Sequence, residues 1–493
     1  TFEQYSVILV CMAFFFTFLR LHEVKVTERR VFHITGFIVV ALGCGLFTNQ
    51  IILSDFMEEH QINIRMFRPM ESYQKYGGVL TFARSVGYAV VKKPEGYSTA
   101  KVDQIIQEYE KKSANAQQST AKQYPNIITV VNETFADIKV LGDFKTNEDY
   151  MPYFHSLKKN CVTGYTYASI VGGQTANTEF ELLTGNTLGF LSAGTTAFQL
   201  YIHGQMPSLV SNLKAEGYSG NKAMHPFNPY NYNRPAVYKD FGFTDFIDKF
   251  DFPKNVKRVR EYISDEANVD RIISEYEKNR KKTDQPFYMY NMTIQNHSPY
   301  DKDATNFKQP IKIESGKYDA EANRYLNLIK YSDDSLKQLT SYFEKCKEPT
   351  IILFLGDHQP RLTDEFMNKI TNGQYQTWSS EQMMKRYQVP FVIWANYDIK
   401  EQHIEKTSMN YMQSILTQTA GVKMTGYQRF LNEVRKEVPT ITSQGYWGKN
   451  GKFYQINDKG SPYYGIIQKY RMIQYNMMFE KKNRRDSFFE VSK

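Results

Sequence analysis

The chain has 493 residues, enough for more than one unit of usual domain size, and 41% of them are hydrophobic, as in globular proteins. Its net charge of +9 is modest for this length and its basic residues are spread over many loops, so we expect no nucleic acid partner. None of the four cysteines has metal-binding spacing, so neither a disulfide framework nor a zinc finger is predicted.

Two apolar segments lie near the N-terminus. Residues 31–53 (VFHITGFIVVALGCGLFTNQIIL) contain no Lys, Arg, Asp or Glu, and at about 1.5 Å per residue they are long enough to cross a bilayer. Residues 5–19 are shorter and lack the basic start and cleavage site of a signal peptide. Because the first residue is Thr1 rather than Met, we expect residues 1–54 to hold transmembrane helices that end a larger membrane domain.

The loop between these segments predicts the orientation of the chain. Residues 20–30 (RLHEVKVTERR) are rich in Lys and Arg, and short loops of this kind stay in the cytoplasm. Two helices joined on the inside both end outside. We therefore expect a multi-pass protein of the cell membrane whose catalytic part is extracytoplasmic.

Residues 55–123 differ in composition from both neighbours. The first half mixes aromatic, Met and basic residues, as in an amphipathic segment at a membrane interface, although a plain surface helix has a similar composition. The second half (TAKVDQIIQEYEKKSANAQQSTAKQ) is charged and typical of an exposed helical linker. We expect a juxtamembrane segment followed by this linker.

Residues 124–493 read as one α/β domain. Four apolar runs of strand length recur there: NIITVV, PFYMYNMTI, PTIILFLGD and VPFVIWAN. Helical patterns lie between them, and the clearest covers residues 318–343. This alternation predicts a doubly wound, mostly parallel sheet with helices on both faces, which binds its ligands beyond the carboxyl ends of the strands.

Polar residues follow three of the predicted strands. Glu133 comes after the first run, His297 after the second, and Asp357 with His358 after the third. Taken singly, each has a structural explanation as a helix cap, a turn or a lone histidine. Because three strand ends meet at one edge of a parallel sheet, the set instead predicts oxygen and nitrogen ligands for Mn, Zn or Mg.

A threonine in GGQTANTEFELLTG, residues 172–185, is the candidate nucleophile. Thr175 follows a flexible Gly-Gly-Gln turn, where a threonine is also common as a helix cap. No G-x-S-x-G elbow or Ser-His-Asp order is present to activate a hydroxyl by a base. A divalent metal can supply that activation. We expect Glu179 to fix the turn that holds Thr175.

Four motifs within residues 124–426 resemble a known family: VVNETFAD, GGQTANTEFELLTG, TIQNHSPY and LFLGDHQPRL, in that order. Together they are similar to the lipoteichoic acid synthase-like phosphoglycerol transferases of the alkaline phosphatase and sulfatase superfamily. The resemblance implies one divalent ion, with Mn²⁺ expected ahead of Mg²⁺ or Zn²⁺. It also implies Glu133, Thr175, Asp357 and His358 as the metal ligands, with Thr175 as the nucleophile.

The same resemblance implies a substrate site. His297 matches the family's substrate-side histidine, and HPFNPYNYNR matches a further element through His225, Tyr232 and Arg234. The polymer synthase of the family has Trp where this chain has Tyr232, which keeps an aromatic face. We expect Arg234 to hold phosphate oxygens, His225 and Tyr232 to bind glycerol hydroxyls, and His297 to bind substrate and assist proton transfer.

The function implied is transfer of glycerol phosphate from phosphatidylglycerol in the membrane to a glycerol phosphate polymer or a glycan, through a phosphoglycerol-threonine intermediate. Two alternatives stay open. One is a phosphodiesterase or phosphatase on the same scaffold, because water can replace the acceptor. The other is a non-catalytic membrane-anchored binding or sensing protein, which fits a complete set of metal ligands less well.

Overall fold

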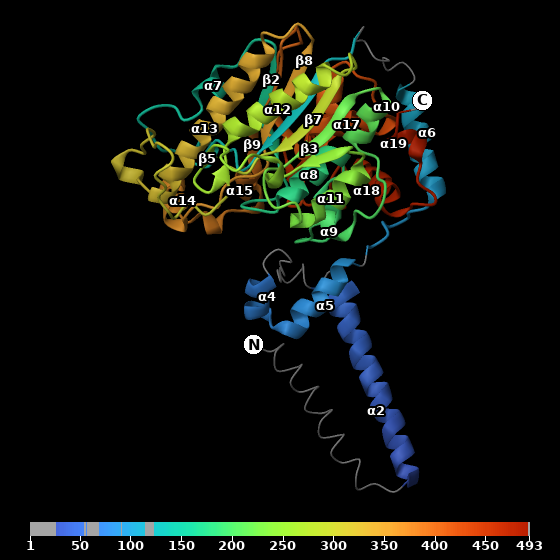
Figure 1. Ribbon diagram of the computed structural model, residues 1–493. Coiled ribbons are helices and arrows are strands. Elements are labelled where there is room, and N and C mark those ends of the chain that lie inside the picture. The colour runs from blue at the N-terminus through green and yellow to red at the C-terminus, as the bar shows by residue number, and fades with distance from the viewer. Residues whose placement is uncertain (1–25, 54–55, 57–68, 90, 114–122, 492–493) are drawn as a thin grey trace. The chain divides into compact units, whose positions relative to one another are not determined.

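The computed structural model describes residues 26–53, 56, 69–89, 91–113 and 123–491 (Figure 1). The chain divides into two compact units, residues 1–91 and 92–493, and each is described by itself. The predicted division at residues 54 and 123 stays a prediction.

An eight-stranded sheet forms the centre of the second unit. Its strand order is β10-β2-β9-β8-β1-β7-β3-β4, and only β9 runs antiparallel to its neighbours. The predicted mostly parallel α/β sheet is therefore confirmed. The strands are β1 (Asn126–Asn132), β2 (Cys161–Tyr167), β3 (Ser219–Met224), β4 (Asp245–Ile247), β7 (Phe287–Met292), β8 (Thr350–Gly356), β9 (Gln388–Ala395) and β10 (Gln402–Ser408).

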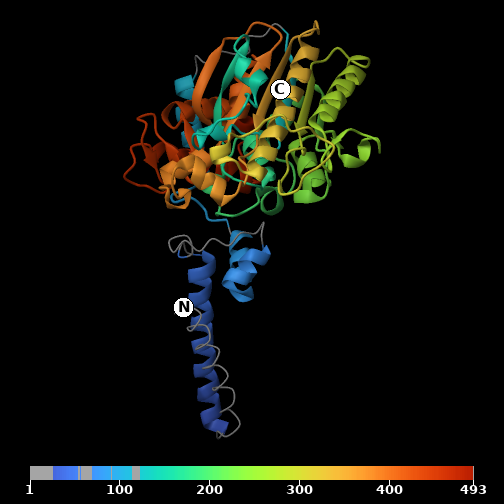
Figure 2. The same ribbon diagram turned by 90° about the vertical axis from the view of Figure 1, so that its left-hand side faces the viewer.

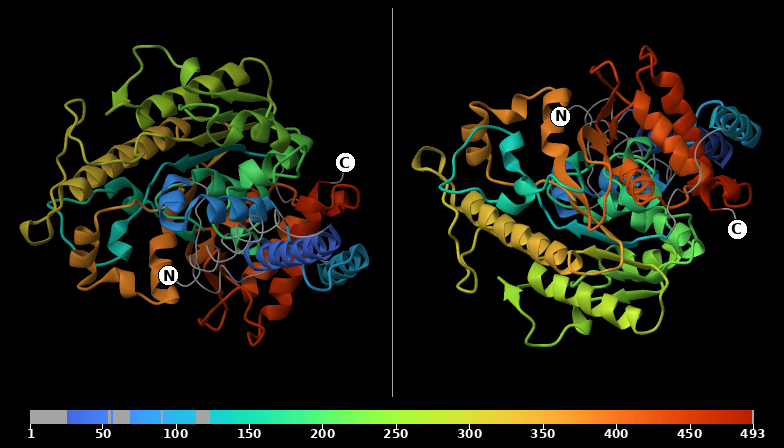
Figure 3. Two further views of the ribbon diagram at one scale, coloured as in Figure 1. Left: turned by 90° about the horizontal axis from the view of Figure 1, so that it is seen from below. Right: turned by 90° about the horizontal axis from the view of Figure 1, so that it is seen from above.

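Helices cover both faces of this sheet (Figures 1 and 3). Alternate residues of β1, β7 and β8 pack against α12 (Asp265–Arg280) and α13 (Ala320–Phe343), which lie side by side on one face. The remaining longer helices of the unit are α8 (Thr175–Thr184), α10 (Leu209–Ala215), α11 (Arg234–Phe241), α14 (Asp364–Thr371), α16 (Met412–Thr419), α17 (Gly426–Glu437) and α18 (Tyr464–Phe479). Two small antiparallel sheets, β5–β6 (Arg258–Val259 and Tyr262–Ile263) and β11–β13 (Thr440–Thr442, Gly445–Trp447 and Phe453–Tyr454), complete the unit.

All four apolar runs predicted as strands are strands: β1, β7, β8 and β9. Burial explains why these were recognisable, because every residue of β1, β7 and β8 is buried. The other four strands of this sheet have mixed or partly exposed patterns, and sequence reasoning did not find them. The predicted helix over 318–343 begins at Ala320, where Asp319 caps the amide of Ala322.

The first unit contains one long apolar helix, α2 (Val26–Phe47), which continues into a π-helical turn, η1 (Thr48–Leu53) (Figure 2). Within the described residues, 34–52 form the single stretch long and apolar enough to cross a membrane, with a mean hydropathy of 1.7 and no buried residue. This agrees with the span predicted over 31–53. The other predicted span, residues 5–19, lies outside the described residues.

Two short helices follow α2 in the same unit, α4 (Pro69–Tyr76) and α5 (Gly78–Ala89). Several large apolar side chains of these helices are exposed, among them Met70, Val79 and Phe82. An exposed apolar face is the pattern expected of a segment at a membrane interface, and that role stays a prediction.

The helix predicted as a linker, α6 (Thr99–Ser113), packs on the second unit. Val102, Ile105 and Tyr109 are buried on one of its faces, and α6 contacts α18. The Asp103 carboxylate accepts a hydrogen bond from the Arg485 guanidinium at 2.7 Å. The apolar i, i+3, i+7 spacing that makes this contact was hidden in a strongly charged sequence.

Candidate metal centre and substrate site

Strand register brings the first two acidic residues together. β1 and β8 are parallel neighbours in which Asn132 lies opposite Gly356, so the next residue of each strand, Glu133 and Asp357, leaves the sheet at the same point. Gly356 is required there, because a Cβ at this position would lie 1.9 Å from the carbonyl oxygen of Phe135. The close approach of the two loops therefore depends on a glycine immediately before Asp357.

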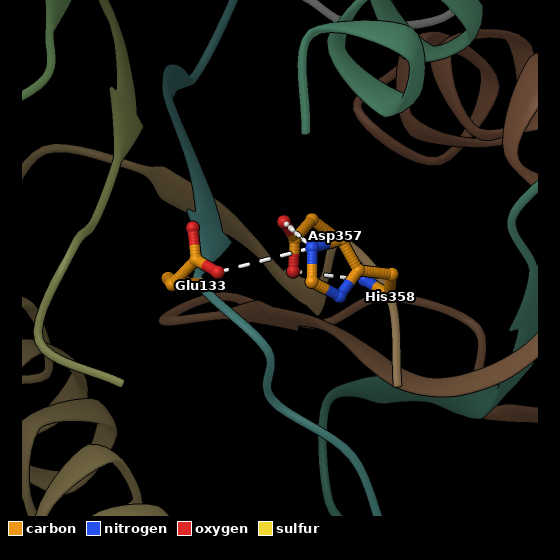
Figure 4. A group of neighbouring side chains, drawn as sticks. All are labelled: Glu133, Asp357 and His358. Carbon is orange, nitrogen blue, oxygen red and sulfur yellow. Dashed lines mark hydrogen bonds and ion pairs between the residues drawn. The ribbon is translucent and has the colours of Figure 1, made fainter. Parts of the chain in front are cut away.

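Glu133, Asp357 and His358 form the candidate metal centre (Figure 4). One ligand atom from each lies within 4.8 Å of the others, and all three residues are buried. The Nε2 atom of His358 is 3.2 Å from Asp357 Oδ2 and 3.8 Å from Glu133 Oε1. Of the described residues, these are the ones that gather as a group of three or more potential His, Cys or carboxylate ligands.

The surroundings of this centre leave its ligand atoms available. Asp357 Oδ2 and His358 Nε2 are buried without a hydrogen-bond partner, which is costly unless a cation or water binds them. The Nδ1 atom of His358 lies 3.0 Å from the carbonyl oxygen of Gln359, which can only accept, so Nδ1 carries the proton and Nε2 keeps its lone pair. Burial, and then the Asp357 charge, raise the pKa of Glu133 well above its usual range. A divalent cation fits these ligand atoms and would relieve the electrostatic repulsion between the Glu133 and Asp357 carboxylates.

Thr175 is the first residue of α8 and lies beside this centre. Three consecutive residues with positive φ lead into it: Gly172 (66°), Gly173 (138°) and Gln174 (68°). The left-handed conformation of Gln174, which has a Cβ, stores strain of the kind found at functional sites. The Thr175 hydroxyl is buried and donates to Glu133 Oε2 at 3.5 Å. The structure thus places the four expected metal ligands together.

His225 and His297 have the same tautomer by the same argument. The Nδ1 atom of His225 lies 3.0 Å from the Met292 carbonyl oxygen, and that of His297 lies 2.6 Å from the Ser298 carbonyl oxygen. Each ring therefore keeps a lone pair on Nε2. Burial lowers the pKa of both histidines, so both are neutral at pH 7. Neutral imidazoles suit hydroxyl binding and proton acceptance.

Arg234 is the first residue of α11, and Tyr232 lies in the 3-10 turn that precedes it, η4 (Asn231–Asn233). Tyr232 has a φ of 60°, and its ring centroid lies 5.1 Å from the Arg234 guanidinium carbon, within cation–π distance. Arg234 is 1% exposed; its charge partly offsets the burial that raises the pKa of Glu133, and it adds to the burial that lowers the pKa of His225. These couplings place Arg234 within electrostatic reach of the candidate metal centre and of His225.

Sequence reasoning missed residues that support the site from a distance. The Arg260 guanidinium donates to the carbonyl oxygens of Gln295 and His297 at 2.8 and 2.7 Å and so fixes the loop after β7. Asp265 accepts from Asn132 at 2.8 Å and from a serine of α13, which ties the end of β1 to α12 and α13. No local sequence pattern predicts these interactions, because Arg260 and Asp265 are 35 or more residues from the groups that they bind here.

A buried oxygen and nitrogen ligand set at the carboxyl edge of a mostly parallel sheet, beside a hydroxyl at a helix N-terminus, is the arrangement of an α/β domain of the alkaline phosphatase and sulfatase type. The chain belongs to the sulfatase family, which it matches over residues 125–422. That superfamily is metal-dependent, in agreement with the candidate centre.

Two proteins with similar sequences show how much of a family member's length this chain covers. A Rhizobium meliloti (strain 1021) protein named for the modification of cyclic beta-1,2-glucan is 30% identical over 86% of this chain and 65% of that protein. The lipoteichoic acid synthase of Staphylococcus aureus (strain USA300) is 29% identical over 38% of this chain and 28% of the synthase. The chain thus spans less than two thirds of the length of either relative.

The fold is also that of a solved structure. The phosphoglycerol transferase GacH of Streptococcus pyogenes, solved with sn-glycerol-1-phosphate, superposes with a TM-score of 0.65 over 82% of this chain and 100% of that chain, at 21% identity. The resemblance to lipoteichoic acid synthase-like phosphoglycerol transferases is confirmed by these matches.

Proposed function

We propose that this protein transfers glycerol phosphate from phosphatidylglycerol to a hydroxyl of a cell-envelope polymer or glycan. The observation that carries the proposal is the cluster of Glu133, Asp357 and His358 together with the Thr175 hydroxyl, which donates to Glu133. In this proposal the four side chains hold one divalent ion, with Mn²⁺ expected. When bound, the ion neutralises the two carboxylates, favours ionisation of the Thr175 hydroxyl and draws charge from the phosphate.

The first step loads the threonine. The Thr175 oxygen attacks phosphorus, forming an ester bond, and the bond from phosphorus to the diacylglycerol oxygen breaks. Diacylglycerol leaves with the proton of the Thr175 hydroxyl, and glycerol phosphate stays on Thr175. Arg234 suits the charge on the phosphate oxygens, because its guanidinium is buried beside the centre and keeps N–H donors for a ligand.

The second step releases the product. The acceptor hydroxyl attacks phosphorus and loses its proton, and the Thr175 oxygen leaves. His297 is neutral at pH 7 with a lone pair on Nε2, so it suits taking that proton and passing it to the departing Thr175 oxygen. His225 and Tyr232 are proposed to hold the glycerol unit, His225 as an acceptor through Nε2 and Tyr232 through its ring and hydroxyl.

The donor and acceptor are proposed from chemistry and from relatives. An apolar helix long enough to span a membrane precedes the catalytic unit, which supports a lipid donor and an extracytoplasmic site at the cell membrane. One relative is named for lipoteichoic acid synthesis and another for modification of a glucan, which supports a polyol phosphate polymer or a glycan as acceptor.

The test measures turnover of a fluorescent phosphatidylglycerol by the purified protein with Mn²⁺. We expect release of fluorescent diacylglycerol, and a loss of at least about 1000-fold in Thr175→Ala, because the nucleophile is removed. Thr175→Ser keeps a hydroxyl and is expected to retain part of the activity. Thr305→Ala, at an exposed threonine, is the matched control and is expected to be fully active.

Two outcomes contradict the proposal. Absence of diacylglycerol release by the Mn²⁺-loaded protein removes lipid as the donor, and full activity of Thr175→Ala removes the threonine as nucleophile. Release of glycerol phosphate with no acceptor product identifies the protein instead as a hydrolase on the same site.

A further inference from the structure

Arg234 is held by a carboxylate that belongs to neither the metal centre nor the turn before Thr175. The Nε and Nη2 atoms of Arg234 both donate to Oε1 of Glu179, at 3.1 and 2.7 Å. Both side chains are buried, with 2% and 0% of their side-chain surface exposed. Glu179 therefore does not hold the Thr175 turn as expected from the sequence but pairs with the arginine.

The second oxygen of Glu179 is also committed. Its Oε2 accepts hydrogen bonds from the hydroxyls of Tyr238 and Tyr290, the latter at 3.2 Å. Burial, and then the Glu179 charge, raise the pKa of both tyrosines well above its usual value, so both hydroxyls stay donors. The two oxygens of Glu179 thus accept four hydrogen bonds, which fix the orientation of its carboxylate. The Nε and Nη2 side of the Arg234 guanidinium, which is bound to this carboxylate, is fixed with it.

The pairing leaves one edge of the guanidinium for a ligand. Nε and one side of Nη2 face Glu179, while Nη1 makes one hydrogen bond within the described part of the chain, to the Asn231 carbonyl oxygen at the limiting distance of 3.5 Å. A guanidinium presents five N–H donors in a planar fork, so donors on the Nη1 edge remain for phosphate oxygens.

One helix carries both the nucleophile and this carboxylate. Thr175 and Glu179 are four residues apart on α8, which puts them on the same face one turn apart. All ten residues of α8 are buried, so the helix is fixed in the fold. The distance between the Thr175 oxygen and the Arg234 guanidinium is thereby set through a single rigid element.

We propose that Glu179 is a positioning residue, which holds the Arg234 guanidinium so that its Nη1 edge meets the phosphate attacked by Thr175. This rests on the proposed function. Glu179 also keeps the buried arginine from pairing with Glu133, whose carboxylate lies within its electrostatic reach. Without Glu179, the arginine is drawn to the metal ligands and lost to the substrate.

The test measures binding of inorganic phosphate to the Mn²⁺-loaded protein by calorimetry, with Mn²⁺ affinity measured separately. We expect Glu179→Gln to weaken phosphate binding at least about tenfold, because the arginine loses its charged partner. Tyr290→Phe removes one of four donors, leaves the ion pair intact, and is expected to weaken phosphate binding about threefold. Glu181→Gln is the matched control, a buried glutamate of the same helix that bonds Ser169 and Leu188 instead, and is expected to bind phosphate as the parent chain does.

Phosphate binding separates this proposal from the function on which it rests. If the parent chain binds phosphate but turns over no lipid, the proposed function fails and the positioning role is still measured. The positioning role is overturned if Glu179→Gln folds and binds phosphate normally. If Glu179→Gln does not fold, unchanged phosphate binding by the folded Tyr290→Phe overturns it. An equal loss of phosphate affinity in Glu181→Gln also contradicts it, because the effect is then a general one of α8.

Discussion

At the scale of single residues, two side chains of the candidate centre each have one atom held by hydrogen bonds and another atom without a hydrogen-bond partner. Asp357 Oδ1 accepts two backbone amides, from Thr134 at 2.6 Å and from His358 at 2.8 Å, whereas Oδ2 has no hydrogen-bond partner. One oxygen is fixed by the backbone and the other is left for an ion. His358 repeats this division between Nδ1 and Nε2. Such one-sided bonding orients ligand atoms before any ion arrives.

Metal binding is therefore predicted to stabilise the fold. Addition of Mn²⁺ at about 100 times its Kd contributes about 2.7 kcal/mol to the unfolding free energy, which corresponds to a rise in Tm of about 3 °C for a unit of this size. In Asp357→Asn the rise is expected to vanish, because one anionic ligand is lost. The measurement is a thermal melt with and without Mn²⁺.

The control for this prediction is Asp284→Asn, whose parent side chain is 97% exposed and which is expected to keep the rise in Tm. A rise of full size in Asp357→Asn contradicts the assignment of Asp357 as a ligand, whatever the activity of the variant.

At the scale of elements, α8 is unusual because most of its side chains are polar and yet all ten of its residues are buried. Each buried polar side chain on it has a partner elsewhere: Asn177 bonds the backbone of residues 195 and 197, and Thr178 donates to the Asp357 carbonyl oxygen at 2.8 Å. Glu181 Oε1 accepts from Ser169, Thr187 and the Leu188 amide. Helix α8 is thus tied to several loops by hydrogen bonds, which set its position more narrowly than apolar packing does.

This packing predicts a stability that falls as pH rises. Burial raises the pKa of Glu181 from 4.5 to about 7, against the hydrogen bonds that lower it. A raised folded-state pKa means that stability is complete below about pH 4.5 and is lost as pH rises towards 7, by at most about 3 kcal/mol. Glu181→Gln keeps the acceptor oxygen and does not ionise, so its stability relative to the parent chain is expected to increase over this range.

Denaturant titrations followed by tryptophan fluorescence measure this difference, because Trp378, Trp394 and Trp447, the three tryptophans of the chain, all lie in the second unit. Groups other than Glu181 titrate equally in both proteins and cancel in the comparison. A pH-independent difference between the two proteins over this range contradicts a raised pKa of Glu181 in the folded protein.

Elements also show where sequence reasoning succeeds and where it stops. β1, β7 and β8 were predictable because strands buried on both faces are continuously apolar, and the candidate ligands were predictable because they follow such strands directly. The partly polar β2 and β3 carry no such signal. The pairing of Glu179 with Arg234 also leaves no signal in the sequence, because the two residues are 55 positions apart and each alone resembles a charged surface residue.

At the scale of the whole molecule, the boundary of the second unit decides which residues must be kept for that unit to fold. Contacts within the chain place residues 92–493 in one unit, whereas composition predicts a boundary at 124. The difference is α6, which buries Val102, Ile105 and Tyr109 against the unit and pairs Glu108 with Lys469 at 2.8 Å. Three buried apolar side chains contribute about 5 kcal/mol, far more than the exposed ion pairs on the same helix.

Two truncated chains test this boundary. Residues 92–493 are expected to melt, by tryptophan fluorescence, at the temperature of the second unit in the whole chain. Residues 124–493 lack α6 and are expected to melt about 6 °C lower, because the surface that α6 covers becomes exposed to water. Arg485→Ala in residues 92–493 removes the ion pair with Asp103 but not the apolar contact, so its Tm is expected to fall by about 1 °C or less. Equal melting temperatures of the two truncated chains contradict a structural role for α6 and support a linker that ends at residue 123. A fall in Arg485→Ala as large as that on removal of α6 would instead assign the attachment of the helix to its charges.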